Sequence, residues 1–217
     1  MTHDLLESIS QRISGTEDAE NCRIYEVANE LYRRCRLYES ELRKGEKYVR
    51  ASDIERIITE EYANEFGLWI PISQIFELGT PGPSGNENDT YVKDNLIFKV
   101  NNLLNSNGSV LQLFCKMLLH NMLFVETAYK FYGFTGFPGS SIMAVFTQYL
   151  IKDATPATMV EIATYMAALG FDSTPIKGRF TNQEFEVWDL LPRNVLKDSE
   201  GDIFVIDAEI KLCQNKP

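Results

Sequence analysis

The first 66 residues carry apolar side chains every three or four positions, which is the spacing of amphipathic helices. The pattern predicts three helices, the last of which ends at Gly67. The apolar stripe of the long middle helix consists of Ile24, Val27, Ala28, Leu31, Cys35, Tyr38 and Leu42. Ser52 and Glu55 have the spacing of a capping box and are expected to begin the third helix. This segment shows no pattern of known chemistry, so we interpret it as a packing module, with a partner-binding module as the alternative.

The middle of the chain is expected to form two strands and a buried helix. Residues 95–101 read as an apolar strand interrupted by Lys99, and residues 142–151 read as a second apolar strand. Between them, Ser109 is placed to cap a helix over about residues 110–124. That helix is apolar on nearly every face, as is typical of a helix inside a core.

A hairpin near the C-terminal end carries the most informative side chains. Two apolar runs within residues 195–206 flank a polar turn in which Gly201 supplies a positive φ. Asp189 and Asn194 come just before the first strand, and Asp207 follows the second, so all three are expected at one end of the hairpin. Carboxylate and carboxamide oxygens are ligands that Mg²⁺ prefers. The alternative is an ordinary surface hairpin with acidic ends.

These residues carry a resemblance to a known family. Asp189, Asn194 and the residues between them resemble the catalytic loop of protein kinases, Asp-Leu-x-x-x-Asn, and Asp207 stands where those enzymes have Asp-Phe-Gly. The sequence Asp207-Ala208-Glu209 is closer to the Asp-x-Glu motif of aminoglycoside- and choline-kinase-like enzymes. Over about residues 70–212 the chain resembles the compact kinase domain of bacterial polyvalent proteins, which occur on phages and conjugative elements.

The resemblance implies binding of ATP and Mg²⁺ and assigns roles to single residues. Asp189 would accept or orient the proton of the attacking hydroxyl, while Asn194 and Asp207 would hold Mg²⁺ against the phosphates. Lys99 resembles the strand lysine that grips the α- and β-phosphates. For Lys99 the alternative is a place on the solvated face of its strand.

Two further nucleotide contacts follow from position along the chain. The loop before the Lys99 strand contains Gly82 and Gly85, which would approach the phosphates, although its spacing departs from Gly-x-Gly-x-x-Gly and a plain flexible loop is the alternative. The end of the strand over 142–151 stands where kinases contact adenine, so Gln148 to Leu150 are hinge candidates. An ordinary core strand explains that apolar run equally well.

One expected part of a kinase is missing from the pattern. Kinases carry a glutamate in the helix that pairs with the strand lysine. The corresponding helix here offers none before Glu126, at or past its end. Either Glu126 or Glu87 pairs with Lys99, or the pair is absent.

Composition restricts the remaining possibilities. A formal net charge of −10 argues against a nucleic-acid-binding surface, which requires clustered Lys and Arg. No apolar run reaches membrane-spanning length, and no signal-peptide pattern is present. Four dispersed cysteines fit a reducing cytoplasm, and with only two histidines they make a zinc site improbable. No feature of the sequence specifies an oligomeric state.

The implied fold is α+β: a minimal two-lobed kinase-like fold with a small antiparallel-sheet lobe and a truncated helical lobe. A small lobe and hinge are expected over 67–151, and the catalytic hairpin and minimal larger lobe over 152–217. One helix, from Pro156 in its first turn to Leu169, precedes the hairpin and cannot alone cover its apolar face. We therefore expect the helices of residues 1–66 to complete the larger lobe.

The function implied by the resemblance is phosphoryl transfer from ATP to a hydroxyl, with a protein Ser, Thr or Tyr as acceptor. A small-molecule kinase of aminoglycoside type is the second enzyme hypothesis, favoured by Asp207-Ala208-Glu209. A pseudokinase, which binds nucleotide or a partner without catalysis, is the third, favoured by the missing helix glutamate.

Overall fold

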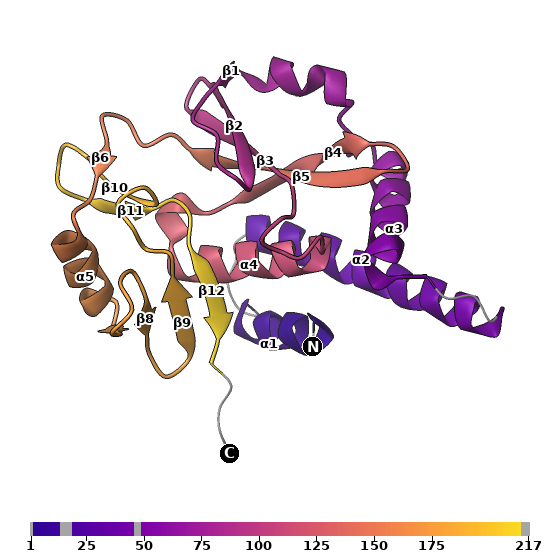
Figure 1. Cartoon of the computed structure of the whole chain (residues 1–217), viewed down its shortest axis with the longest axis horizontal. Helices are drawn as coiled ribbons and strands as arrows, with labels where there is room; N and C mark the ends of the chain where they lie inside the picture. Colours follow the sequence, from indigo (N-terminus) through magenta and orange to yellow (C-terminus); the bar gives the residue numbers. More distant parts are fainter. Residues whose placement is uncertain (1, 14–18, 46–48, 214–217) are drawn as a thin grey trace. The chain divides into compact units, whose positions relative to one another are not determined.

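The computed structural model describes residues 2–13, 19–45 and 49–213. The chain forms two compact units, one of residues 1–118 and 129–150 and the other of residues 119–128 and 151–217. Both contain helices and small antiparallel sheets (Figure 1), which confirms the predicted α+β class.

Three helices open the first unit, as the apolar stripes predicted. They are α1 (Thr2–Ile13), α2 (Ala19–Lys44) and α3 (Ala51–Glu65). The stripe of α2 is buried from Ile24 to Cys35 and half-buried at Tyr38 and Leu42, so the 3.6-residue period located the packed face correctly.

The start of α3 differs from the prediction. Its N-cap is Arg50, without a side-chain hydrogen bond, so the capping box of Ser52 and Glu55 is wrong. The Glu55 carboxylate instead accepts hydrogen bonds from Ser109 Oγ at 2.9 and 3.1 Å, at the beginning of α4 (Val110–Leu123). Ser109 caps α4 as predicted, since its Oγ accepts from the Gln112 N–H. Burial raises the pKa of the Glu55 carboxyl above its ordinary value.

A five-stranded antiparallel sheet forms the centre of the first unit. Its strands are β1 (Thr80–Pro81), β2 (Asn88–Lys93), β3 (Leu96–Asn101), β4 (Lys130–Phe137) and β5 (Ser141–Tyr149). Their order in the sheet is β1-β2-β3-β5-β4. The short helix η1 (Ile72–Leu78) packs Ile75 and Leu78 against one apolar cluster of this sheet, which includes Phe98 and Val145.

The aromatic side chains of β4 and β5 form the packing surface for α4. Phe114 of α4 lies 5.1 to 5.9 Å, between ring centroids, from Phe131, Phe134 and Phe146. Helices α2 and α3 also contact β4 in this unit. The N-terminal helices therefore have a packing partner in the sheet of their own unit, while their predicted role in the larger lobe stays a prediction.

The described part of the second unit holds two small sheets, the end of α4, helix α5 and a short 3₁₀ segment. The sheet β11-β10-β6 contains the predicted hairpin, and the other sheet has the order β12-β9-β8-β7. The elements are η2 (Val125–Thr127), β6 (Thr155–Pro156), α5 (Met159–Ala168), β7 (Asp172–Ser173), β8 (Phe180–Thr181), β9 (Phe185–Trp188), β10 (Val195–Lys197), β11 (Ile203–Val205) and β12 (Glu209–Leu212). Gly201 has φ of 97° in the hairpin turn, as predicted.

Helix α5 begins three residues later than predicted. Pro156 is not in its first turn but lies in β6, opposite Leu196 of β10. Thr158 caps the helix in a capping box with Glu161. This Thr-x-x-Glu pattern determines the start of the helix, rather than the proline at position 156. The Glu161 carboxylate also pairs with Lys197 Nζ at 2.6 Å, which joins α5 to β10.

Two elements of the second unit cover the hairpin. Val195 and Val205 are buried, and both α5 and η2 contact β11. The Thr127 hydroxyl in η2 donates to the Val205 carbonyl. The apolar pattern indicates only the helix that became α5, because the short segment η2 carries no helical repeat of its own.

The buried stripe of α2 generates a stability prediction. Leu31→Ala should lower the free energy of unfolding by about 2–5 kcal/mol, because Leu31 is 1% exposed and its removal leaves a cavity. Leu37→Ala on the same helix, where the side chain is 54% exposed, should change it by less than about 0.5 kcal/mol. Urea unfolding of both variants measures the difference; equal losses would contradict the assigned face.

Glu161 generates a prediction about pH. The hydrogen bonds from Lys197 and Thr158 lower the pKa of its carboxyl from 4.5 to about 2. The stability that the carboxylate contributes is therefore present above pH 4.5 and is lost as the pH falls towards 2. Glu161→Gln should lower the melting temperature most at neutral pH, and the difference from wild type should vanish near pH 2. Glu200→Gln, in the exposed turn, is the matched control and should differ little at any pH.

Candidate active site

Strand pairing brings the predicted catalytic segments of the second unit together. Strand β9 leads directly into Asp189, and β12 begins two residues after Asp207, with Trp188 opposite Glu209 in an antiparallel ladder. On the hairpin side, the Ile206 N–H donates to the Asn194 carbonyl at 2.9 Å. The loop around Asp189 and the segment around Asp207 are thus held at both of their ends.

The carboxylate of Asp189 is fixed by the two residues that precede β10. Asn194 Nδ2 donates to Asp189 Oδ2 at 2.8 Å and to the Asp189 carbonyl at 2.9 Å. The Arg193 guanidinium donates to Asp189 Oδ1. Both carboxylate oxygens therefore have an assigned donor, and the orientation of the carboxylate is determined within its own loop.

The backbone of Asp189 adopts a left-handed conformation with φ of 61°. Among residues other than glycine, Asp and Asn tolerate this region best, and such conformations concentrate at functional sites. The neighbouring Leu190 N–H donates to the Gly178 carbonyl at 3.0 Å. A Cβ on Gly178 would lie 2.9 Å from the Leu190 carbonyl oxygen, so the β7–β8 connection can approach the loop this closely only with glycine.

Asn194 and Asp207 are the residues predicted to hold Mg²⁺, and the hydrogen bonds of the Asn194 side chain are compatible with that prediction. Both Nδ2 hydrogens of Asn194 are donated to Asp189, and no described residue donates to the Asn194 side-chain oxygen. That oxygen is the atom left for a hard cation. The described residues contain no cluster of three or more His, Cys, Asp or Glu side chains, so any magnesium here would depend on these two oxygen donors with water and phosphate.

Lys99 lies in the first unit, on β3. Its side chain is buried, with Nζ 3.2 Å from Tyr129 Oη and 4.9 Å from the centre of the Tyr129 ring. The solvated-face alternative for Lys99 is therefore wrong. The buried ammonium is stabilised in part by a hydroxyl and an aromatic face.

The two candidate glutamates do not pair with Lys99. Glu87 pairs with Lys116 Nζ of α4 at 3.3 Å and accepts from the side chains of Asn101 and Asn105 at 3.0 and 2.7 Å. Glu126 is exposed and forms no ion pair with any described residue. An ion pair between α4 and the sheet therefore exists, but its charges are exchanged relative to the kinase pattern: α4 supplies the lysine, Lys116, and the residue before β2 supplies the glutamate, Glu87.

The backbone N–H groups of the two glycines expected to approach phosphate already donate hydrogen bonds within the β1–β2 hairpin. The Gly82 N–H donates to the Thr90 carbonyl, and the Gly85 N–H donates to the Asn88 carbonyl, both at 2.9 Å. The backbone N–H groups of Ser84 and Asn86 have no acceptor among the described residues. The donors that this loop can offer to a ligand therefore include those of Ser84 and Asn86.

The hinge candidates lie at the end of β5. Gln148 is buried and paired with Ile97 of β3, so its backbone belongs to the sheet ladder. The Leu150 N–H donates to the Asn95 carbonyl at 2.9 Å. A ligand contact at Leu150 would thus use its carbonyl oxygen rather than its N–H.

A comparison with models of protein families identifies the family to which the chain belongs. Residues 52–214 match the model of the serine/threonine/tyrosine kinase found in polyvalent proteins. The chain belongs to this family. A comparison with curated proteins gave no match.

Membership of this kinase family places the observations in context. The match begins inside α3, so α1 and α2 precede the family region. The residues predicted from the kinase resemblance divide between the units. Lys99, the glycine loop and the hinge candidates lie in the first unit, and Asp189, Asn194 and Asp207 lie in the second.

No helix in the described part of the chain is long and apolar enough to cross a membrane.

The sequence analysis missed three residues of the site. Arg193 lies within the Asp-x-x-x-x-Asn motif, next to Asn194. A positive charge four positions after Asp189 was a usable signal for an ion pair with its carboxylate. Lys116 is the one Lys, Arg, Asp or Glu in the mostly apolar helix 110–123, and a buried charge of this kind is expected to be paired. Gly178 gave no signal, because its role depends on a contact with residues twelve positions away.

The reversed ion pair generates a testable prediction. Glu87→Gln or Lys116→Met alone should lower the free energy of unfolding, by up to about 3–5 kcal/mol, since each removes one half of a buried ion pair. The double variant should recover most of that loss. Chemical unfolding of the four proteins forms a double-mutant cycle, and additive losses would show that the two charges do not interact.

Proposed function

We propose that the protein is an ATP- and Mg²⁺-dependent kinase that transfers a phosphoryl group to a hydroxyl of a protein Ser, Thr or Tyr. The observation that carries this proposal is the Asp189 carboxylate held by Asn194 and Arg193 at the end of the β10–β11 hairpin. Family membership supports the reaction class. The free thiols of the four cysteines support a reducing cytoplasm, in keeping with a polyvalent protein of a bacterial mobile element.

The residues of the second unit would position the acceptor and the metal. Asp189 accepts the hydrogen bond of the attacking hydroxyl and takes up its proton as the hydroxyl oxygen bonds to the γ-phosphorus and the bond from that phosphorus to the β-phosphate oxygen breaks, which releases ADP. Asn194 contributes its side-chain oxygen, and Asp207 its carboxylate, to Mg²⁺. The magnesium ion would neutralise charge on the phosphates. Arg193 is a positioning residue, because it holds the Asp189 carboxylate.

The residues of the first unit would bind the nucleotide. The ammonium group of Lys99 is the cation for the α- and β-phosphates, and Tyr129 sets its position. The free N–H groups of Ser84 and Asn86 extend the phosphate contacts, beside Gly82 and Gly85, which keep the hairpin narrow. The carbonyl oxygen of Leu150, together with Gln148, is the proposed adenine contact.

Two other functions each have an observation in their favour. A small-molecule kinase of aminoglycoside type is favoured by Asp207-Ala208-Glu209. A pseudokinase is favoured by the geometry of Glu87, which pairs with Lys116 of α4 rather than with the strand lysine Lys99. Incubation with γ-labelled ATP and Mg²⁺, with a bacterial lysate or with an aminoglycoside, separates the three: label enters protein, small molecule or neither.

The metal and hydroxyl roles predict different behaviour for two aspartates. ATP should raise the melting temperature only when Mg²⁺ or Mn²⁺ is present, and Asp207→Asn should remove most of that shift. Asp189→Asn should keep the shift but lower turnover by at least about a hundredfold, because a group that accepts a proton acts on the transition state. Asp172→Asn, on the exposed β7 strand, is the control and should change neither quantity. An undiminished shift in Asp207→Asn would overturn the metal assignment.

A further inference from the structure

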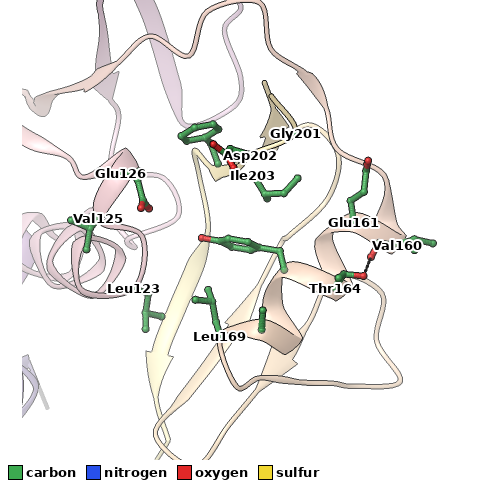
Figure 2. Close-up of a pocket in the computed structure, with 13 residues that line it drawn as sticks. Leu123, Val125, Glu126, Val160, Glu161, Thr164, Leu169, Gly201, Asp202 and Ile203 are labelled. Carbon is green, nitrogen blue, oxygen red and sulfur yellow. Dashed lines mark hydrogen bonds between the residues drawn. The ribbon is translucent and has the colours of Figure 1, made fainter. Parts of the chain in front are cut away.

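A pocket of about 780 Å³ lies within the second unit, on elements that carry none of the proposed catalytic residues. It is bounded by the end of α4 with η2, by α5, and by the turn of the β10–β11 hairpin. Figure 2 shows Leu123 and Glu126 on one side, Val160 and Thr164 on the other, and Asp202 and Ile203 between them. We call this pocket the α5 groove.

The walls of the α5 groove are apolar and open to solvent. Val125 is 65% exposed and Val160 is 76% exposed, although both are aliphatic. Leu169 at the end of α5 is also exposed, and Leu123 and Ile203 are half-buried. Large exposed aliphatic side chains from separate elements that meet around one hollow are typical of a binding surface.

The rim of the groove is acidic and unneutralised. Glu126 and Asp202 are exposed and form no ion pair with any described residue. Glu161 differs, since Lys197 neutralises it. Glu126 and Tyr165 both line the hollow, and burial together with the nearby Glu126 carboxylate raises the pKa of Tyr165. No Lys or Arg is among the residues that line the hollow.

We propose that the α5 groove binds a peptide segment of a partner protein in which two aliphatic side chains are flanked by Lys or Arg. The aliphatic side chains would cover the exposed apolar walls, and the basic residues would pair with Glu126 and Asp202. A volume of about 780 Å³ accommodates a few side chains of such a segment. A nucleotide is excluded as the occupant because its phosphates would face two uncompensated carboxylates. The proposal is independent of phosphoryl transfer.

The test measures binding of defined peptides to the whole chain. The probe is a short dye-labelled peptide with two central leucines and lysines on both sides, followed by fluorescence anisotropy. Two matched peptides replace the lysines by glutamates or the leucines by serines, and both should bind at least about tenfold more weakly. Affinity for the probe should fall as salt is raised, since the rim charges are exposed.

Variants of the chain locate the binding. The double variant Glu126→Gln/Asp202→Asn and the single variant Val160→Lys should each weaken probe binding at least about tenfold. Glu200→Gln removes one charge from the same hairpin turn outside the groove and should weaken it less than about twofold. All four substitutions are at exposed positions, so circular dichroism should show unchanged folding.

Three results would overturn the proposal. One is equal affinity of the double variant and the wild type, and another is equal binding of the serine peptide, which would reduce the interaction to charge alone. The third is self-association of the wild-type chain that Val160→Lys abolishes in light scattering, which would assign the groove to a second copy of the chain.

Discussion

The proposed chemistry of the second unit depends on the antiparallel pairing of β9 with β12. This ladder sets Trp188, just before Asp189, opposite Glu209, just after Asp207, so two segments eighteen residues apart begin and end at fixed points. The β10–β11 hairpin fills the interval and holds Asn194 through the Ile206 N–H. Backbone hydrogen bonds therefore bring the three segments that carry these residues to one end of the hairpin, and the orientation of each side chain depends on its own contacts.

In the first unit, the corresponding constraint is a set of buried charges inside an aromatic and aliphatic core. Glu87 and Lys116 neutralise each other between the β1–β2 hairpin and α4, and two asparagine amides satisfy the remaining oxygen positions of Glu87. Such a pair contributes little net stability over an apolar packing. Its effect is to select one position of the hairpin relative to the helix, because any other position would bury an unpaired charge.

Sequence alone predicted those features whose signals are local. The hairpin, its turn at Gly201, the stripe of α2 and the Ser109 cap each arise from residues within a few positions of one another, and the structure confirms them. The two wrong predictions, at Pro156 and Glu55, arise where another interaction is available. Thr158 caps α5 in place of a start at Pro156, and the Glu55 carboxylate accepts a hydrogen bond from Ser109 at the start of α4 instead of capping its own helix. Strand β12 and the Glu87–Lys116 pair required knowledge of which distant segments meet, and a single sequence does not contain that.

The left-handed backbone of Asp189 limits what substitution experiments can mean at this position. Alanine or a longer side chain would add about 1–2 kcal/mol of conformational strain to the loss of the carboxylate, and the loop could relax into another shape. Asparagine keeps both the backbone preference and the side-chain outline. The effect of a substitution here therefore depends on loop geometry as well as on the loss of the carboxylate, and asparagine or glycine replaces an aspartate in this conformation with the least backbone strain.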